Sequence, residues 1–128
     1  MKKISLFAIL FFFSTAVFAQ TQSEKEVKDL LANKWKLTHI EIGGKNIEWP
    51  ASAGDSFLHF KADGTILKID TEGEVKGKWT YNHSTKVIHT EDEEGIEDYE
   101  IVKINDTEFR FKTTADDQEL VMTLKKVK

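Results

Sequence analysis

The 128-residue sequence contains no cysteine and only one proline. Without cysteine, the chain has no disulfide, no zinc–thiolate or iron–sulfur ligand and no thiol nucleophile. It also lacks an excess of basic residues, because 22 acidic residues outweigh 18 basic ones to give a formal charge of −4. This balance argues against a general nucleic-acid-binding protein, whose surface is basic. A chain of this length allows one domain.

The first nineteen residues have the three parts of a secretory signal peptide. Lys2 and Lys3 precede an apolar run at 4–13, and residues 14–19 form a region of small residues suited to cleavage. The apolar run is too short for a membrane span, which needs roughly 20 residues. We predict cleavage between Ala19 and Gln20. The mature domain is then residues 20–128, with a formal charge close to −6.

The residues after the apolar run also bear on where the protein acts. A bacterial lipid anchor requires a cysteine after this run, and the chain has none. We therefore expect an exported, soluble and non-lipidated protein, periplasmic or extracellular, without a membrane span and monomeric. A domain of this size buries enough surface to form one core without disulfides.

One short helix is expected at the start of the mature chain, at Ser23–Ala32. Ser23 and Glu26 have the spacing of a capping box, and Val27, Leu30 and Leu31 follow at helical spacing. Asn33 is the expected stop.

After this helix the hydrophobic period changes to two, which is typical of half-buried strands. Turn residues separate the strands, and Asp63-Gly64 and Asn105-Asp106 are strong turn signals. The expected strands run from Lys34 to the Gly43-Gly44 turn and then over Phe57–Lys61, Thr65–Thr71, Val75–Tyr81, Lys86–Glu91, Glu97–Ile104, Thr107–Lys112 and Glu119–Lys126.

Eight short strands in sequence order predict an all-β fold, an eight-stranded antiparallel up-and-down β-barrel preceded by a short N-terminal helix. In the first strand, alternation places Trp35, Leu37 and His39 on one face. The long segment Gly44–Ser56 is expected to be a loop or lid at the barrel mouth rather than a tight hairpin.

Three short motifs resemble the lipocalin superfamily, in particular the short lipocalin-like domains exported by Bacteroidetes-type bacteria. They are Asn33–Leu37 at the first strand, Phe60–Thr65 at the second hairpin and Gly77–Tyr81 in the fourth strand. The resemblance covers essentially the whole mature chain. It implies a barrel that binds a hydrophobic ligand, and it carries over no catalytic residues.

Two positions depart from the pattern of that superfamily. Lipocalins have Gly-x-Trp at the first strand, where this chain has Asn33 before Trp35. They also have an arginine near the last strand that packs over the tryptophan, where this chain offers Lys125, Lys126 and Lys128. Lysine lacks the planar fork of arginine, so the resemblance supports the architecture more strongly than the ligand.

The large inward side chains are the candidate ligand contacts. A small barrel also needs such side chains to fill its interior, so a filled core and a true cavity both remain open. In the first strand the candidates are Trp35 and Leu37, and Trp49 is expected over the mouth. The others are Phe60, Trp79, Tyr81, Tyr99, Phe109, Phe111 and Met122.

The four histidines, His39, His59, His83 and His89, do not form a short pair suited to one metal ion, so we predict no metal site and no cofactor. Residues 91–100 hold seven acidic side chains without the spacing of an EF-hand. A charged hairpin that aids solubility explains them, with a weak cation site or a basic partner as the other interpretation.

These patterns predict a binding protein rather than an enzyme, with a small hydrophobic or amphipathic ligand in the barrel. The alternative is a structural or interaction module that binds another envelope protein through its outer face or the acidic hairpin. A barrel enzyme would need titratable groups facing inward, and His39, His59 and His89 are the candidates for such groups.

Overall fold

The computed structural model describes residues 22–128, so the predicted signal peptide and its cleavage site lie outside the described residues. Within this range no helix is long and apolar enough to cross a bilayer. In chain order the elements are α2 (Glu24–Leu31), β1 (Lys34–Ile42), β2 (Lys45–Glu48), the short 3₁₀ helix η1 (Ala51–Ala53), β3 (Phe57–Phe60), β4 (Thr65–Asp70), β5 (Gly73–Asn82), β6 (Val87–Asp92), β7 (Gly95–Ile104), β8 (Glu108–Ala115) and β9 (Gln118–Lys126).

Helix α2 begins as the sequence predicts. The Ser23 side chain accepts a hydrogen bond from the Glu26 amide, and the Glu26 carboxylate accepts one from the Ser23 amide. This capping box satisfies two backbone N–H groups that helix geometry leaves free. At the other end, the Asn33 side-chain amide donates to the Leu30 carbonyl at 2.8 Å, so Asn33 helps to end the helix.

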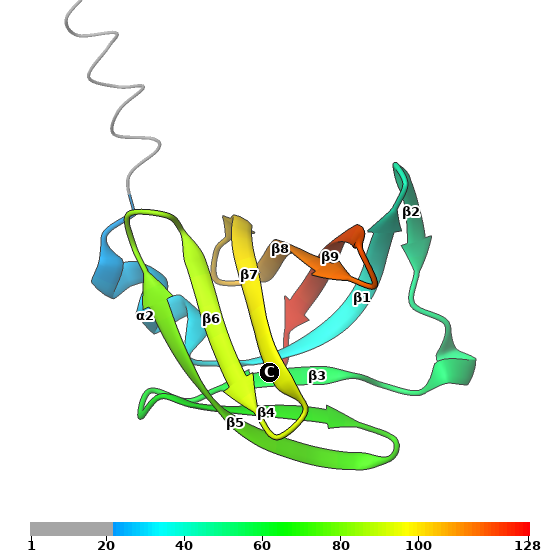
Figure 1. Cartoon of the computed structure of the whole chain (residues 1–128), viewed down its shortest axis with the longest axis horizontal. Helices are drawn as coiled ribbons and strands as arrows, with labels where there is room; N and C mark the ends of the chain where they lie inside the picture. Colours follow the sequence, from blue (N-terminus) through cyan, green and yellow to red (C-terminus); the bar gives the residue numbers. More distant parts are fainter. Residues whose placement is uncertain (1–21) are drawn as a thin grey trace, which may run out of the picture.

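The strands form one antiparallel sheet in which β1 pairs with β3, and each strand from β3 to β9 pairs with the next. The additional pairing of β1 with β9 closes the sheet on itself (Figure 1). The barrel therefore contains eight strands, β1 and β3–β9, with one short helix before the first strand. The predicted fold class is confirmed.

The interpretation of Gly44–Ser56 as a loop or lid was wrong for its first part. Gly43 and Gly44 have φ values of 57° and 82° and form a two-residue turn, so that β2 pairs back onto the second half of β1. Positive φ at both turn residues is the geometry of a type I′ hairpin, which glycine adopts without strain. The rest of the segment reaches the β4–β5 turn, where Gly54 lies against Thr71.

A β-bulge in β1 corrects a second expectation. The pairing with β9 shifts register between Leu37 and His39, so that Leu37 lies opposite Leu124 and Ile40 lies opposite Met122. A bulge adds one residue and reverses which side chains face the core. Ile40, and not His39, therefore packs against the core beyond the bulge.

The barrel interior is densely packed at the end that α2 covers. Val27 and Leu31 of α2 are 3% and 0% exposed, and the Trp35 indole N–H donates to the Leu31 carbonyl at 3.2 Å. Ring centroids of Trp35 and Phe109 lie 5.5 Å apart, and those of Phe60 and Phe109 lie 6.0 Å apart. Aromatic pairs at such distances pack favourably, and this end is a filled core.

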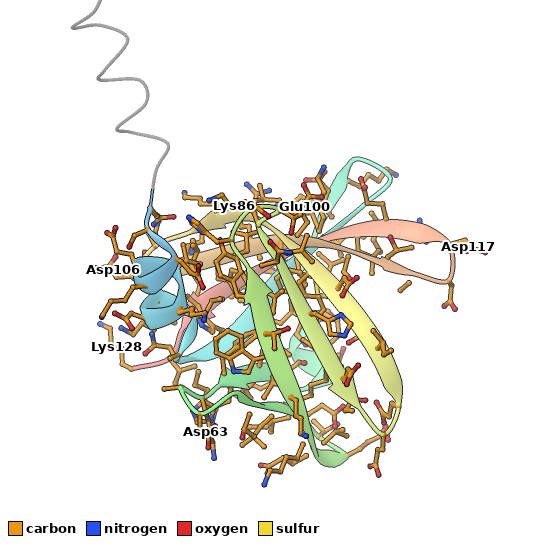
Figure 2. The ribbon with its side chains drawn as sticks, turned by 60° about the vertical axis from the view of Figure 1, so that its left-hand side comes forward. Asp63, Lys86, Glu100, Asp106, Asp117 and Lys128 are labelled. Carbon is orange, nitrogen blue, oxygen red and sulfur yellow. The ribbon has the colours of Figure 1, made fainter. Side chains whose placement is uncertain are left out.

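The two ends of the barrel differ. Figure 2 shows Asp106 and Lys128 near α2 and Asp117 at the tip of the β8–β9 hairpin on the far side. In Figure 1 the β4–β5 turn lies at the lower right and the β6–β7 turn below the centre, both away from α2 at the left. One end is thus plugged by the helix, and the other is bordered by strand turns.

Gly77 in β5 allows a close approach of two strands. A Cβ atom at this position would lie 2.4 Å from the Glu91 carbonyl oxygen and 2.9 Å from Asp92 Cβ. Gly77 is therefore explained by backbone contact with β6, in addition to the alternation of large and small inward residues.

Candidate functional site

A cavity of about 250 Å³ opens at the end of the barrel opposite α2, and we call it the mouth cavity. Its walls combine apolar side chains with a few charged ones. The lining residues are Leu37, Ser56, Phe57, Leu58, Lys68, Ile69, Asp70, Val75, Glu94, Glu97, Tyr99, Phe111, Thr113, Met122 and Leu124. The interior is therefore filled at the α2 end and hollow at the mouth, which combines the two interpretations that the sequence left open.

Four of the candidate ligand contacts lie on the wall of the mouth cavity, namely Leu37, Tyr99, Phe111 and Met122. The Tyr99 and Phe111 rings stack with centroids 4.3 Å apart. Phe111 also contacts Phe109 below it, at 5.0 Å between centroids. This stack forms the floor that separates the mouth cavity from the packed core.

The other candidates lie elsewhere. Trp35, Phe60 and Phe109 are 0–1% exposed and belong to the filled core near α2. Trp79 and Tyr81 border a groove of about 660 Å³ beside α2, at the opposite end of the barrel.

Trp49, which we expected over the barrel mouth, is held away from the cavity by two hydrogen bonds to backbone carbonyls. The Trp49 indole N–H donates to the Gly54 carbonyl at 2.7 Å, and the backbone N–H of Trp49 donates to the Thr38 carbonyl at 2.8 Å. The ring packs partly buried against the core and is not part of the cavity wall.

The sequence did not single out Lys68, which the structure places inside the barrel. Lys68 lies between Leu58 of β3 and Val75 of β5 in the pairing register, and both neighbours face inward. The adjacent row, Phe60, Ile66 and Gly77, is inward as well, because β4 turns its even-numbered residues to the interior. Along β4, Leu67 and Ile69 alternate with Lys68 and Asp70, and Lys68 shares the inner face with the buried Ile66.

Lys68 is the centre of a polar group that also contains Asp92, Glu97 and Tyr99, which we call the Lys68 cluster. The Lys68 Nζ lies 2.8 Å from Asp92 Oδ2 and forms a close ion pair with Glu97 Oε1. The same Glu97 oxygen accepts a hydrogen bond from the Tyr99 hydroxyl at 2.9 Å. The Asp92 side chain is only 2% exposed, whereas those of Lys68 and Glu97 are 21% and 46% exposed.

Lys68 provides the positive charge that compensates the buried oxygen Oδ2 of Asp92. Within residues 22–128 this oxygen has no other hydrogen-bond donor, and the Lys68 ammonium at 2.8 Å is its charge partner. The other oxygen, Oδ1, accepts from the Glu94 amide at 2.8 Å. A buried carboxylate without compensation is costly, so the positive charge of Lys68 stabilises Asp92.

The protonation states of the cluster follow from these contacts. Burial alone lowers the pKa of Lys68, but its ion pairs with Asp92 and Glu97 outweigh burial and raise the pKa above the ordinary lysine value. The ammonium of Lys68 holds the pKa of Asp92 below its usual range. Burial raises the pKa of Tyr99, so the phenol is neutral at pH 7. At this pH Lys68 is therefore a cation and Asp92 an anion.

The three histidines proposed as inward groups face outward. His59 alternates with the inward Leu58 and Phe60, and His39 lies on the outer side of the bulge. His89 Nδ1 lies 2.7 Å from Asp98 and Nε2 lies 3.3 Å from Glu91, and hydrogen bonds to these carboxylates raise the pKa of His89. Within residues 22–128 no group of three or more metal-ligating side chains is placed to hold an ion.

The acidic hairpin at 91–100 divides between the two faces of the sheet. Asp92 and Glu97 belong to the Lys68 cluster, and Glu94 lines the mouth cavity. Glu91 and Asp98 flank His89 on the outer face. The charged hairpin that we expected to aid solubility therefore also places part of its charge at the mouth cavity.

The geometry defines a class of protein: a small closed antiparallel β-barrel, plugged by a helix at one end, with a ligand-sized cavity at the other. The family comparison is more specific, since the model of the lipocalin-like domain matches residues 31–111. The match covers more than half of the chain, and the protein belongs to the lipocalin-like domain family. A search of the curated proteins found no match.

The family match ends at Phe111, within β8, yet the barrel is closed by the following hairpin and by β9 pairing with β1. Lipocalin-like barrels generally bind small hydrophobic ligands. In this chain, Leu124 and Met122 of β9 complete the cavity wall, so the unmatched part of the domain contributes to the candidate site.

Proposed function

We propose that this protein is an exported lipocalin-like binding protein that holds a small, partly apolar molecule in the mouth cavity. The observation that carries the proposal is the cavity of about 250 Å³ at the open end, with apolar walls and a few converging polar groups. Pockets of this composition bind by desolvation and are oriented by their polar groups.

A binding role rather than catalysis is supported by the state of the cavity groups. The Lys68 amine is protonated and paired with two carboxylates, so it is not a nucleophile at neutral pH. The Tyr99 phenol is neutral and donates to Glu97. These groups hold charge in a fixed arrangement, which suits recognition.

The test is native mass spectrometry of the mature protein purified from its own host. The proposal expects a population heavier than the bare chain by the mass of a small molecule, which dissociates on denaturation. The variant Met122→Trp, which adds bulk to the cavity wall, is expected to lose this population while retaining its barrel circular dichroism. Val121→Trp is the matched control, because Val121 is adjacent on β9 and does not line the mouth cavity. If wild type and Val121→Trp both show only the bare chain, the proposal is contradicted.

Export is the second part of the proposal and has its own test. It is supported by the charged, apolar and small-residue regions of residues 1–19. N-terminal sequencing of the protein recovered from its host is expected to begin at Gln20. A protein that retains Met1 and remains in the cytoplasm would contradict export without affecting the cavity.

The second candidate function is an interaction module that binds another envelope protein through the acidic hairpin. Ile96, which is 64% exposed and lies within the acidic hairpin, favours it. The acidic residues of the hairpin around Ile96 would supply the complementary charge that steers a basic partner to this face. Capture of one defined envelope protein by wild type, and its loss in Ile96→Ser with ligand binding unchanged, would support this function.

A further inference from the structure

The charge around the mouth cavity restricts what the cavity can hold, provided that it is a ligand site as proposed above. Its lining includes one cation, Lys68, and three carboxylates, Asp70, Glu94 and Glu97. Asp92, buried behind Lys68, adds a fourth carboxylate next to the cavity. The walls between these groups are apolar.

The single cation is already occupied. Lys68 contacts both Asp92 and Glu97, and Glu97 also accepts from Tyr99. An anionic ligand would have to compete with two carboxylates for the ammonium, and displacing either would leave a carboxylate with a weaker partner. The Asp92 side chain is only 2% exposed, so water does not take the place of Lys68 as the partner of its charge.

The carboxylates, in contrast, can accept further hydrogen bonds. Each carboxylate has about four acceptor sites. The bonds described above engage Oε1 of Glu97, and the Glu94 side chain is on the exposed rim. The negative groups exceed the positive one at the mouth, so the local potential favours a cation.

We propose that the mouth cavity selects an amphipathic cation, that is, a compact apolar body carrying a protonated amine. The apolar body would rest on Phe111, Met122 and Leu37. The amine would lie at the rim, within reach of Glu94 and Glu97. There the protonated amine would replace water as the partner of these two carboxylates. The ion pairs of Lys68 with Asp92 and Glu97 would stay intact.

The cavity volume limits the size of the body. An engineered apolar cavity of about 150 Å³ holds benzene, and drug-sized ligands occupy roughly 300–1,000 Å³. At about 250 Å³, the mouth cavity fits a single ring with a short chain. A long acyl chain or a fused multi-ring body does not fit without a change of the floor.

Isothermal titration calorimetry with three matched probes tests the proposal. The probes are 2-phenylethylamine, 2-phenylethanol and 3-phenylpropanoate, which share the phenyl ring and carry a cation, a neutral group and an anion. The mature wild-type protein is expected to bind the amine about tenfold more tightly than the alcohol, and the carboxylate more weakly than the alcohol. The preference for the amine is expected to fall as salt increases.

Two variants locate the effect. Glu94→Gln and Glu97→Gln are expected to weaken binding of the amine severalfold and leave binding of the alcohol unchanged. Glu94→Gln keeps the proposal testable if Glu97→Gln affects folding, because Glu97 contacts Lys68 and Glu94 is on the rim. The control is Asp116→Asn, which makes the same change of charge in the β8–β9 turn, outside the cavity lining.

The outcomes separate this inference from the proposed function. Binding of the alcohol or the carboxylate as tightly as the amine would overturn selection of a cation, while the cavity remains a ligand site. An amine preference that persists in both glutamine variants would also overturn it, because the charges assigned here would not be responsible. Failure of all three probes to bind would overturn the inference, while the native mass spectrum of the wild-type protein tests the proposed function separately.

Discussion

Replacing Lys68 by methionine is expected to destabilise the barrel far more than the same change at an exposed ion pair. Lys68 and Asp92 approach to 2.8 Å, and Lys25 and Asp29 on α2 approach to 2.7 Å. The two pairs differ in burial, since the Asp92 side chain is 2% exposed and that of Asp29 is 65% exposed. Distance alone would rank the pairs equally, whereas burial ranks Lys68 first.

The magnitude follows from the charge that is left behind. Removing one partner of a buried pair costs about 3–5 kcal/mol, because the other charge stays buried without compensation. Lys68 is 21% exposed, which places Lys68→Met near the lower end, at about 3 kcal/mol. With a urea dependence of about 1–3 kcal/mol per molar, the midpoint falls by about 1–3 M. Lys25→Met is expected to leave the midpoint nearly unchanged, as is usual for exposed pairs.

The pH dependence provides a second signature. The folded pKa of Asp92 is lowered, so the stabilisation from its charge is present above the unfolded pKa of about 3.9 and is lost as pH falls through the folded value. In Lys68→Met the buried carboxyl loses its cation, so desolvation raises its pKa and acid neutralises it readily. The difference between wild type and variant is therefore expected to shrink from pH 7 to pH 4.

The assay is urea unfolding of the mature proteins at pH 7 and pH 4, followed by tryptophan fluorescence. The double variant Lys68→Met, Asp92→Leu is expected to regain most of the lost stability at pH 7, because it leaves no buried charge. A loss below about 1 kcal/mol for Lys68→Met at pH 7, or one that does not change with pH, would refute the reasoning, since such small values are typical of solvated pairs.

Three further predictions concern the scaffold. Gly77→Ala is expected to lower Tm by about 10 °C in calorimetry, because its Cβ would lie 2.4 Å from a backbone oxygen; an unchanged Tm would contradict the close approach of β5 and β6. Ser23→Ala is expected to lose about 1 kcal/mol in urea unfolding through loss of the helix cap, whereas no loss would mean that α2 contributes little to folding. In an NMR titration the pKa of His89 is expected to lie above 6.5 in wild type and to be lower in the Asp98→Asn variant. This pair stabilises the fold below the unfolded pKa and stops doing so as pH rises through the folded pKa, so equal values in both proteins would contradict the contact.

Much of the fold could be predicted because local signals and global topology agree. The capping box of Ser23 and Glu26 marks the helix, and the Asp63-Gly64 turn marks the β3–β4 hairpin. Alternation along β5 marks inward Trp79 and Tyr81. Each signal acts over a few residues, and consecutive antiparallel strands need no long-range information to find their partners.

The features that were missed depend on neighbouring strands or on geometry that the alternation does not encode. The Gly43-Gly44 turn was a signal for β2, but the short strand that follows has no buried residue to reveal it. The bulge after Leu37 reverses the facing of His39, and it is fixed by the register with β9. Lys68 faces inward because Asp92 of β6 and Glu97 of β7 compensate its charge, which only the closed barrel brings together.

The most direct test of the mouth cavity as the ligand site is NMR chemical-shift mapping on the mature protein with the tightest-binding of the three phenyl probes. Saturable shifts are predicted to be largest at residues of the mouth cavity, including Lys68, Tyr99 and Met122. Trp79 and Tyr81, which border the groove beside α2, are predicted to change little. Largest shifts at Trp79 and Tyr81, or shifts that do not saturate, would contradict the assignment.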